Sequence, residues 1–302
     1  MRTPPIILTM LCVVFVVSDV PDPAAAQSPP RTDTLSLHSE TFHNTRLLRI
    51  WLPPGYEDPA NRSERYPVVY FTDGVATQHG RRLDSTAASL TAKGAIPPTV
   101  FVMIDNGGST NTSRAPGRDR ADEYLPYPDA PASWDPPLAN PHGKLFPDFL
   151  ENDVRPLVES KFRVRTDPPH VGLAGSSYGG AIAAYTAIVR PGHYGLLLLE
   201  SPSLYIADGI LLHSADTTTL WPARVYIAVG TNEGATAEAR EAMVSDARTL
   251  AHLITTHSSR TRTCFWSVPG AQHGEDAWRA RLPAALTFLL GSGVCPGTAL
   301  PS

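Results

Sequence analysis

The sequence has little of what marks metal, nucleotide and nucleic-acid sites. Its 302 residues contain 3 cysteines, and no spacing of cysteine and histidine resembles a zinc site. It has neither a G-x-G-x-x-G motif nor a P-loop, and its net charge of −4 comes without a basic patch. We therefore expect no metal, no cofactor and no nucleic-acid partner.

An apolar run at the N-terminus is typical of an export signal. Residues 6–17 follow Arg2 and precede the small residues 24–26, which suit a cleavage site. The run is too short to span a bilayer comfortably, which favours a signal peptide over a membrane anchor. We therefore predict that residues 1–26 are removed, and that the mature protein is secreted or periplasmic without a stable membrane anchor.

Two cysteines remain after this predicted cleavage, Cys264 and Cys295. An exported chain meets an oxidising compartment, and an even number of cysteines permits one disulfide. We expect this disulfide to tie the last predicted strand to the C-terminal tail. The alternative is two unpaired thiols.

Short apolar runs alternate with helical patterns along the rest of the chain. The predicted strands are residues 34–39, 45–52, 66–71, 99–104, 171–174, 196–199, 225–229 and 264–268. The predicted helices are residues 83–93, 146–161 with a kink at Pro156, an alanine-rich stretch that ends before Pro191, 236–256 and 283–290, and a loop rich in proline and aspartate covers 106–141. This alternation predicts an α/β fold, with a mostly parallel central sheet and helices on both faces. We predict one domain over residues 34–302, after a flexible lead-in at 27–33.

The most informative motif is a single G-x-S-x-G pentapeptide at residues 175–179. An apolar run precedes it and a helical stretch follows, so its central serine, Ser177, is expected on a sharp strand-to-helix turn with its hydroxyl exposed. The glycines let strand and helix pack closely there. Ser176 would need glycines where Ala174 and Tyr178 stand. Ser177 is therefore the predicted nucleophile.

A serine nucleophile needs a base to accept its proton and an acid to orient that base. In the α/β-hydrolase fold the chain order is serine, acid, histidine, with each residue on a loop after a strand. Glu233 follows the predicted strand 225–229, and Asp208 and Asp216 are rival acids in the preceding loop. His273 follows the last predicted strand, in a glycine-flanked loop. The order predicts a Ser–His–Glu triad.

The negative oxygen that develops on an attacked carbonyl needs backbone N–H donors. One donor is expected from Tyr178, directly after the nucleophile. The other is expected from Val75, in the loop that follows the predicted strand 66–71.

Several ordered motifs together resemble one family. They are residues 49–56 (RIWLPPGY), 66–74 (YPVVYFTDG), 120–126 (RADEYLP), 175–180 (GSSYGG), 230–233 (GTNE), and His273 with Trp278. From about residue 35 to 290 the chain resembles the enterochelin esterase and esterase D-like group of α/β-hydrolases, which also includes the mycolyltransferase antigens. The resemblance implies ester hydrolysis without cofactor or metal.

The same resemblance indicates which residues border the substrate pocket: Asp73, Arg120, Tyr205 and Trp278. Tyr205 stands where many relatives carry tryptophan. We expect Arg120 to hold the pocket loop by a salt bridge with Glu123. The alternative is that Arg120 meets an anionic group of the substrate.

The triad and the resemblance lead to one functional hypothesis. We expect a secreted serine carboxylic-ester hydrolase that forms an acyl-enzyme on Ser177, with a small-molecule ester as substrate. Phenolic, feruloyl or siderophore-like esters are candidates. The alternative is an acyltransferase, in which an alcohol replaces water as the acyl acceptor. The sequence leaves the acyl and alcohol specificity and the oligomeric state open.

Overall fold

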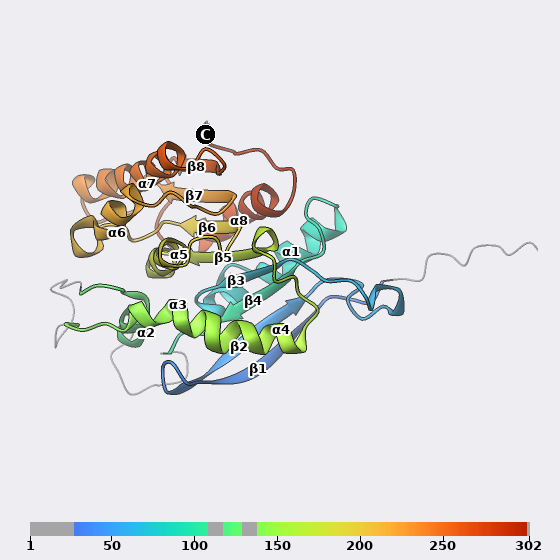
Figure 1. The fold of residues 1–302 in the computed structure, drawn as a ribbon. Coiled ribbons are helices and arrows are strands. Elements are labelled where there is room, and N and C mark those ends of the chain that lie inside the picture. The colour runs from blue at the N-terminus through green and yellow to red at the C-terminus, as the bar shows by residue number, and fades with distance from the viewer. Residues whose placement is uncertain (1–26, 108–116, 129–137, 301–302) are drawn as a thin grey trace, which may run out of the picture.

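A computed structural model describes residues 27–107, 117–128 and 138–300, and the predicted signal peptide lies outside them. The described chain forms a nine-stranded sheet in the order β1-β2-β4-β3-β5-β6-β7-β8-β9 (Figure 1). The strands are β1 (Arg31–Ser39), β2 (Asn44–Leu52), β3 (Val68–Phe71), β4 (Val100–Ile104), β5 (Val171–Ser176), β6 (Leu196–Glu200), β7 (Arg224–Gly230), β8 (Arg262–Val268) and β9 (Thr298–Leu300). The run from β4 through β3, β5, β6 and β7 to β8 is parallel, while β1, β2 and β9 are antiparallel to their neighbours. The predicted mostly parallel α/β fold is therefore confirmed.

Helices cover both faces of this sheet (Figure 1). They are α1 (Leu83–Ala92), α2 (Arg118–Tyr124), α3 (Phe146–Asp148), α4 (Arg155–Lys161), α5 (Tyr178–Val189), α6 (Ile206–Asp216), α7 (Ala237–His257) and α8 (Glu275–Leu290). Because side chains alternate along a strand, Val68 and Tyr70 join the core beneath α5, α6 and α7, while Val69 and Phe71 join the core beneath α1 and α8. The central strands β3 to β7 are buried on both faces, which explains why they read as continuous apolar runs.

Several helical features differ from the sequence expectations. The predicted loop 106–141 contains α2, and the loop after β6 contains α6. The last helix begins at Glu275 rather than at Pro283, which lies inside it. Proline favours the first turn of a helix, but here the buried side chains of Trp278 and Leu282 extend α8 before it. Between α3 and α4 the helix widens into a π-helical segment over Phe149–Val154, just before the predicted kink.

The predicted disulfide between Cys264 and Cys295 is present, with a Cα–Cα distance of 5.4 Å. It joins β8 to the segment that leads into β9, a short edge strand that the sequence did not indicate. The C-terminal segment is therefore held on the edge of the sheet by both a covalent bond and strand pairing.

Candidate active site

The predicted nucleophile lies on the turn between β5 and α5. Ser177 has φ +57°, a left-handed conformation that is strained for a residue with a side chain. A Cβ at Gly175 would collide with the backbone of Gly179, and one at Gly179 would collide with the Thr72 side chain. Only glycines allow this close approach of strand and helix. The neighbouring Ser176 is 0 % exposed, and its hydroxyl has no hydrogen-bond partner in the described chain.

The structure brings His273 and Glu233 together. His273 Nδ1 lies 2.9 Å from Glu233 Oε2, and the Glu233 side chain is 1 % exposed. The other oxygen, Oε1, accepts the backbone N–H of Gly230 at 2.6 Å and the hydroxyl of Ser201 at 2.7 Å. Burial opposes ionisation of Glu233, but the hydrogen bonds from His273, Ser201 and Gly230 outweigh it, so the pKa of this carboxyl lies below its ordinary value.

Neither rival acid contacts His273 in the described chain. Asp208 and Asp216 both lie on α6, which the sequence did not indicate, and Asp216 is 3.1 Å from His257. The residue that faces the predicted base is therefore Glu233, the acid preferred from chain order.

A buried polar network lies behind this acid. The Ser201 hydroxyl accepts hydrogen bonds from Trp278 Nε1 and from Arg281 Nη2, each at 3.0 Å. Arg281 also donates to Glu200 at 2.7 Å, and both of these side chains are almost fully buried. Burial raises the pKa of Glu200 to about 7, although Arg281 acts in the opposite direction. Trp278, which was predicted to border the pocket, is buried and holds the Ser201 hydroxyl that donates to Glu233.

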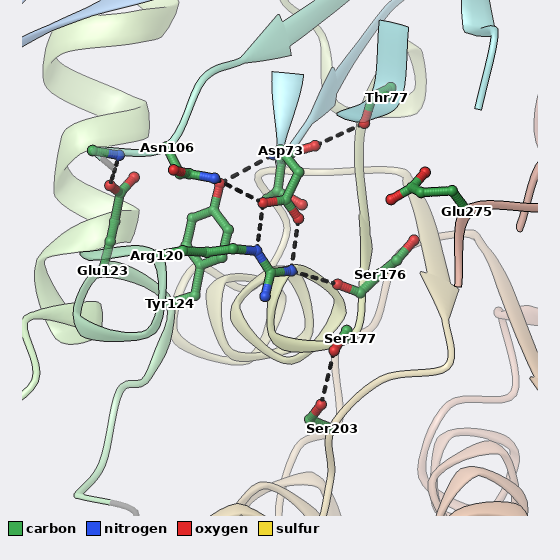
Figure 2. Close-up of polar contacts among 12 residues, drawn as sticks. Asp73, Thr77, Asn106, Arg120, Glu123, Tyr124, Ser176, Ser177, Ser203 and Glu275 are labelled. Carbon is green, nitrogen blue, oxygen red and sulfur yellow. Dashed lines mark hydrogen bonds and ion pairs between the residues drawn. The ribbon is translucent and has the colours of Figure 1, made fainter. Parts of the chain in front are cut away.

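A cavity of about 450 Å³ opens beside the elbow. It is lined by Ser177, Ser203, Tyr205, Glu233, Gly234, Ala239, Ala242, Met243, Asp246 and His273. The three predicted triad residues therefore line the same cavity as Tyr205, which was predicted to border the substrate pocket. The Ser177 Oγ lies 3.4 Å from the Ser203 Oγ (Figure 2), a contact that the sequence did not indicate.

The loop after β3 is held by an ion pair between the partly exposed Arg120 and the buried Asp73 (Figure 2). Arg120 donates to both carboxylate oxygens of Asp73, at 2.6 and 2.8 Å, and to the carbonyl of Ser176 at 3.2 Å. The backbone N–H of Asp73 donates to the Tyr124 hydroxyl, and Asn106 donates to the Asp73 carboxylate. Burial disfavours the charged form of Asp73, but Arg120 outweighs it, so the pKa of this carboxyl is lowered.

The prediction of a salt bridge between Arg120 and Glu123 is wrong. Glu123 instead forms a buried ion pair with Arg46 and accepts the backbone N–H of Gly107. The two residues are only three positions apart, but α2 directs Arg120 toward the elbow and Glu123 toward β2 (Figure 2). Arg120 thus pairs with Asp73 instead of the expected partner.

The two predicted oxyanion donors stand where helical segments begin. Val75 precedes the π-helical turn over Ala76–Gly80, and Tyr178 is the first residue of α5. The first turn of a helix directs backbone N–H groups outward, which suits an anion. Their role in catalysis stays a prediction.

The described residues show neither a cluster of metal-binding side chains nor a helix that could span a membrane. Residues 27–107, 117–128 and 138–300 contain no group of three or more His, Cys, Asp or Glu side chains placed to hold a metal ion. Over the same residues, no helix has the length and apolar character needed to cross a membrane.

The fold and the elbow define the class: the chain has the α/β-hydrolase fold, as have solved esterases that it resembles. Residues 39–289 match the model of the family described as "Putative esterase". The chain therefore belongs to this esterase family.

Among curated proteins, the chain is 30 % identical to the siderophore triacetylfusarinine C esterase of Aspergillus fumigatus over 179 residues, 56 % of this chain and 55 % of that protein. It is 24 % identical to the iron(III) enterobactin esterase of Escherichia coli, over 88 % of this chain and 58 % of that protein. The chain thus spans little more than half the length of these relatives.

Two solved structures have a similar fold. The enterobactin esterase of Shigella flexneri, crystallised in the presence of enterobactin, gives a TM-score of 0.66 at 20 % identity and covers 87 % of this chain and 60 % of that one. The BES protein of Bacillus cereus gives a TM-score of 0.69 at 19 % identity and covers 94 % of this chain and 99 % of that one.

Proposed function

We propose that this protein is a serine carboxylic-ester hydrolase that works through an acyl-enzyme on Ser177. The observation that carries the proposal is the 2.9 Å contact between His273 and Glu233 at the cavity that Ser177 lines. Ser177 occupies the strained turn of a nucleophile elbow. The esterase family of the chain and the names of its relatives support the same reaction.

The hydrogen bond between His273 and Glu233 determines which ring nitrogen of His273 can act as the base. Glu233 holds Nδ1 of His273, so Nε2 is the nitrogen that accepts the proton of Ser177. The Ser177 oxygen then bonds to the ester carbonyl carbon, and the backbone N–H groups of Val75 and Tyr178 donate to the resulting oxyanion. His273 returns the proton to the departing alcohol, which leaves the acyl group on Ser177.

Water then removes the acyl group from Ser177 in the second half of the reaction, where it takes the place of the departed alcohol. His273 takes a proton from water, the hydroxide oxygen bonds to the acyl carbon, and the Ser177 oxygen leaves with the proton from His273. Because the Ser177 hydroxyl contacts Ser203 in the structure, it must turn toward His273 for the first step. Hydrogen bonds of this kind commonly tighten only when substrate binds.

We also propose that the protein acts outside the cytosol. The disulfide between Cys264 and Cys295 supports this location, because such bonds persist in oxidising compartments.

Two adjacent serines provide the test and its control. Ser177→Ala should lower kcat for p-nitrophenyl esters by about 10⁴ or more, because it removes the atom that carries the acyl group. Ser176→Ala should change kcat by less than about threefold, because the Ser176 hydroxyl is buried without a partner. Mass spectrometry after rapid quenching should show the acyl group on Ser177. Full activity of Ser177→Ala, or the reverse ranking of the two variants, would refute the proposal.

Product analysis in the presence of an added alcohol separates hydrolysis from acyl transfer. Hydrolysis gives the free acid, whereas transfer gives a new ester of the added alcohol. The proposal expects free acid as the main product at millimolar alcohol. Predominant transfer to the alcohol would identify an acyltransferase that uses the same residues.

A further inference from the structure

A second cavity adjoins the one at the elbow. The first, of about 450 Å³, contains Ser177 and His273, and the second, of about 570 Å³, lies between α6 and α7. Tyr205 and Asp246 line both cavities. The two therefore form one groove that leads away from the predicted nucleophile.

One face of α7 forms a wall along the whole groove. Ala239, Ala242, Met243 and Asp246 line the first cavity, at spacings of three, four and seven residues that place them on one side of a helix. Thr249 and Leu253 continue the same face into the second cavity. With a rise of 1.5 Å per residue, the wall runs about 10 Å from Ala239 to Asp246.

The chemical character of the groove changes at Asp246. Before it, the α7 side chains are two alanines and a methionine. At and beyond it, three carboxylates contribute: Asp246, Asp208 and Asp216. Burial raises the pKa of Asp246.

The groove has no permanent positive charge to balance Asp246, although His213 lines the second cavity and His257 lies 3.1 Å from Asp216. Among the described residues, neither cavity has a lysine or an arginine in its lining. The nearby Arg120 is paired with both carboxylate oxygens of Asp73. An ester that carries a carboxylate charge would therefore meet the carboxylate of Asp246 without a lysine or arginine in the lining to offset it.

We propose that the groove along α7 binds the acyl part of the ester, and that it selects uncharged, linear apolar acyl groups that extend about 10 Å from the reacting carbonyl and excludes anionic ones. This inference rests on the proposed function, since it assumes that Ser177 attacks the ester. It names a substrate class that differs from the siderophores in the names of the relatives.

The test compares p-nitrophenyl acetate, butyrate, hexanoate, octanoate and the mono-p-nitrophenyl ester of octanedioic acid, by kcat/KM. Each added methylene should raise kcat/KM by up to about fourfold as it is buried along α7, and the gain should stop once the chain reaches the acidic end. The octanedioic ester, equal in length to octanoate but with a terminal carboxylate, should be at least about tenfold poorer than octanoate.

Three variants test whether the selectivity for uncharged acyl groups arises in the groove along α7. Asp246→Asn should raise kcat/KM for the octanedioic ester relative to octanoate by about tenfold, because it removes the charge at the far end of the groove and keeps the size of the side chain. Glu241→Gln is the matched control, since it removes the same charge from an exposed residue on another face of α7, and it should change neither ester. Ala242→Phe should fill the groove and abolish the advantage of octanoate over acetate.

The outcomes separate this inference from the proposed function. If the protein hydrolyses acetate but shows no gain with chain length, or treats octanoate and the octanedioic ester alike, the inference fails and the esterase proposal stands. If no ester is hydrolysed, both fail. If Glu241→Gln rescues the octanedioic ester as well as Asp246→Asn does, general surface charge explains the result and the groove does not.

Discussion

Replacing Glu233 by glutamine tests the predicted triad more sharply than removing its side chain. Oε1 of Glu233 faces two donors, the N–H of Gly230 at 2.6 Å and the hydroxyl of Ser201 at 2.7 Å. The Ser201 hydroxyl must donate, because its lone pairs already accept from Trp278 and Arg281. An amide at this position therefore keeps its oxygen on the Oε1 side.

The amide NH₂ group must then face His273, in place of the Oε2 atom that lies 2.9 Å from Nδ1. A donor there requires Nδ1 to be the bare, accepting nitrogen, so the ring proton moves to Nε2. In that tautomer Nε2 cannot accept the proton of Ser177. The same change in a serine protease lowers kcat about 10⁴-fold, and we expect a loss of about 10³- to 10⁴-fold for Glu233→Gln, with KM nearly unchanged.

The assay is hydrolysis of a p-nitrophenyl ester, with thermal unfolding to verify that each variant is folded. Asp208→Asn and Asp216→Asn are the controls, because each removes one carboxylate of a rival acid on α6. We expect both to retain kcat within about threefold. A Glu233→Gln protein with kcat within tenfold of the parent would refute this reasoning. A large loss of kcat in either control would identify that aspartate of α6 as the acid.

Three further predictions concern stability. Arg120→Ala should cost about 1–3 kcal/mol in urea unfolding, because it removes two charged hydrogen bonds from the buried Asp73 carboxylate, which keeps Asn106 and Arg81, the latter at 4.0 Å; an unchanged free energy of unfolding would contradict this. Breaking the disulfide between Cys264 and Cys295, which are separated by 31 residues, should cost about 3–4 kcal/mol, measured as the difference in urea unfolding with and without reductant, and an unchanged midpoint would contradict it. Because burial raises the pKa of Glu200 from 4.5 to about 7, the folded protein keeps this proton longer than the unfolded chain. The contribution of Glu200 to the free energy of unfolding should therefore be fully present below pH 4.5 and be lost as the pH rises through 7, and the difference between the parent and Glu200→Gln across this range should reveal it.

Local patterns in the sequence predict the sheet and the positions of the triad residues. The strands around β5 and β7 are buried on both faces, so they are visible as apolar runs, and the strained turn at Ser177 requires glycines that form a motif. The order of acid and base along the chain restricts the search to the loops after β7 and β8. These features depend on neighbours in sequence, which explains why they could be predicted.

The supporting contacts could not be predicted in this way. Arg281 and Ser201 are 80 positions apart, and Arg120 and Asp73 are 47 apart. Any of many arginines and acids could form such pairs, because a pattern of charges does not specify which ones the fold buries together. The choice of Glu123 as partner of Arg120 followed their closeness in sequence, whereas the fold separates them.

The Ser201 hydroxyl links the predicted catalytic acid to the last helix, and this link bears on when the protein can become active. Ser177, Glu233 and His273 all precede α8 in the chain, but Trp278 and Arg281, which fix the direction of the Ser201 proton, belong to α8. A nascent or truncated chain that ends before Glu275 would contain the three proposed catalytic residues but lack the two donors that hold the Ser201 hydroxyl toward Glu233. We therefore expect the proposed site to become competent only after α8 has been synthesised and has docked against the loop that carries Ser201.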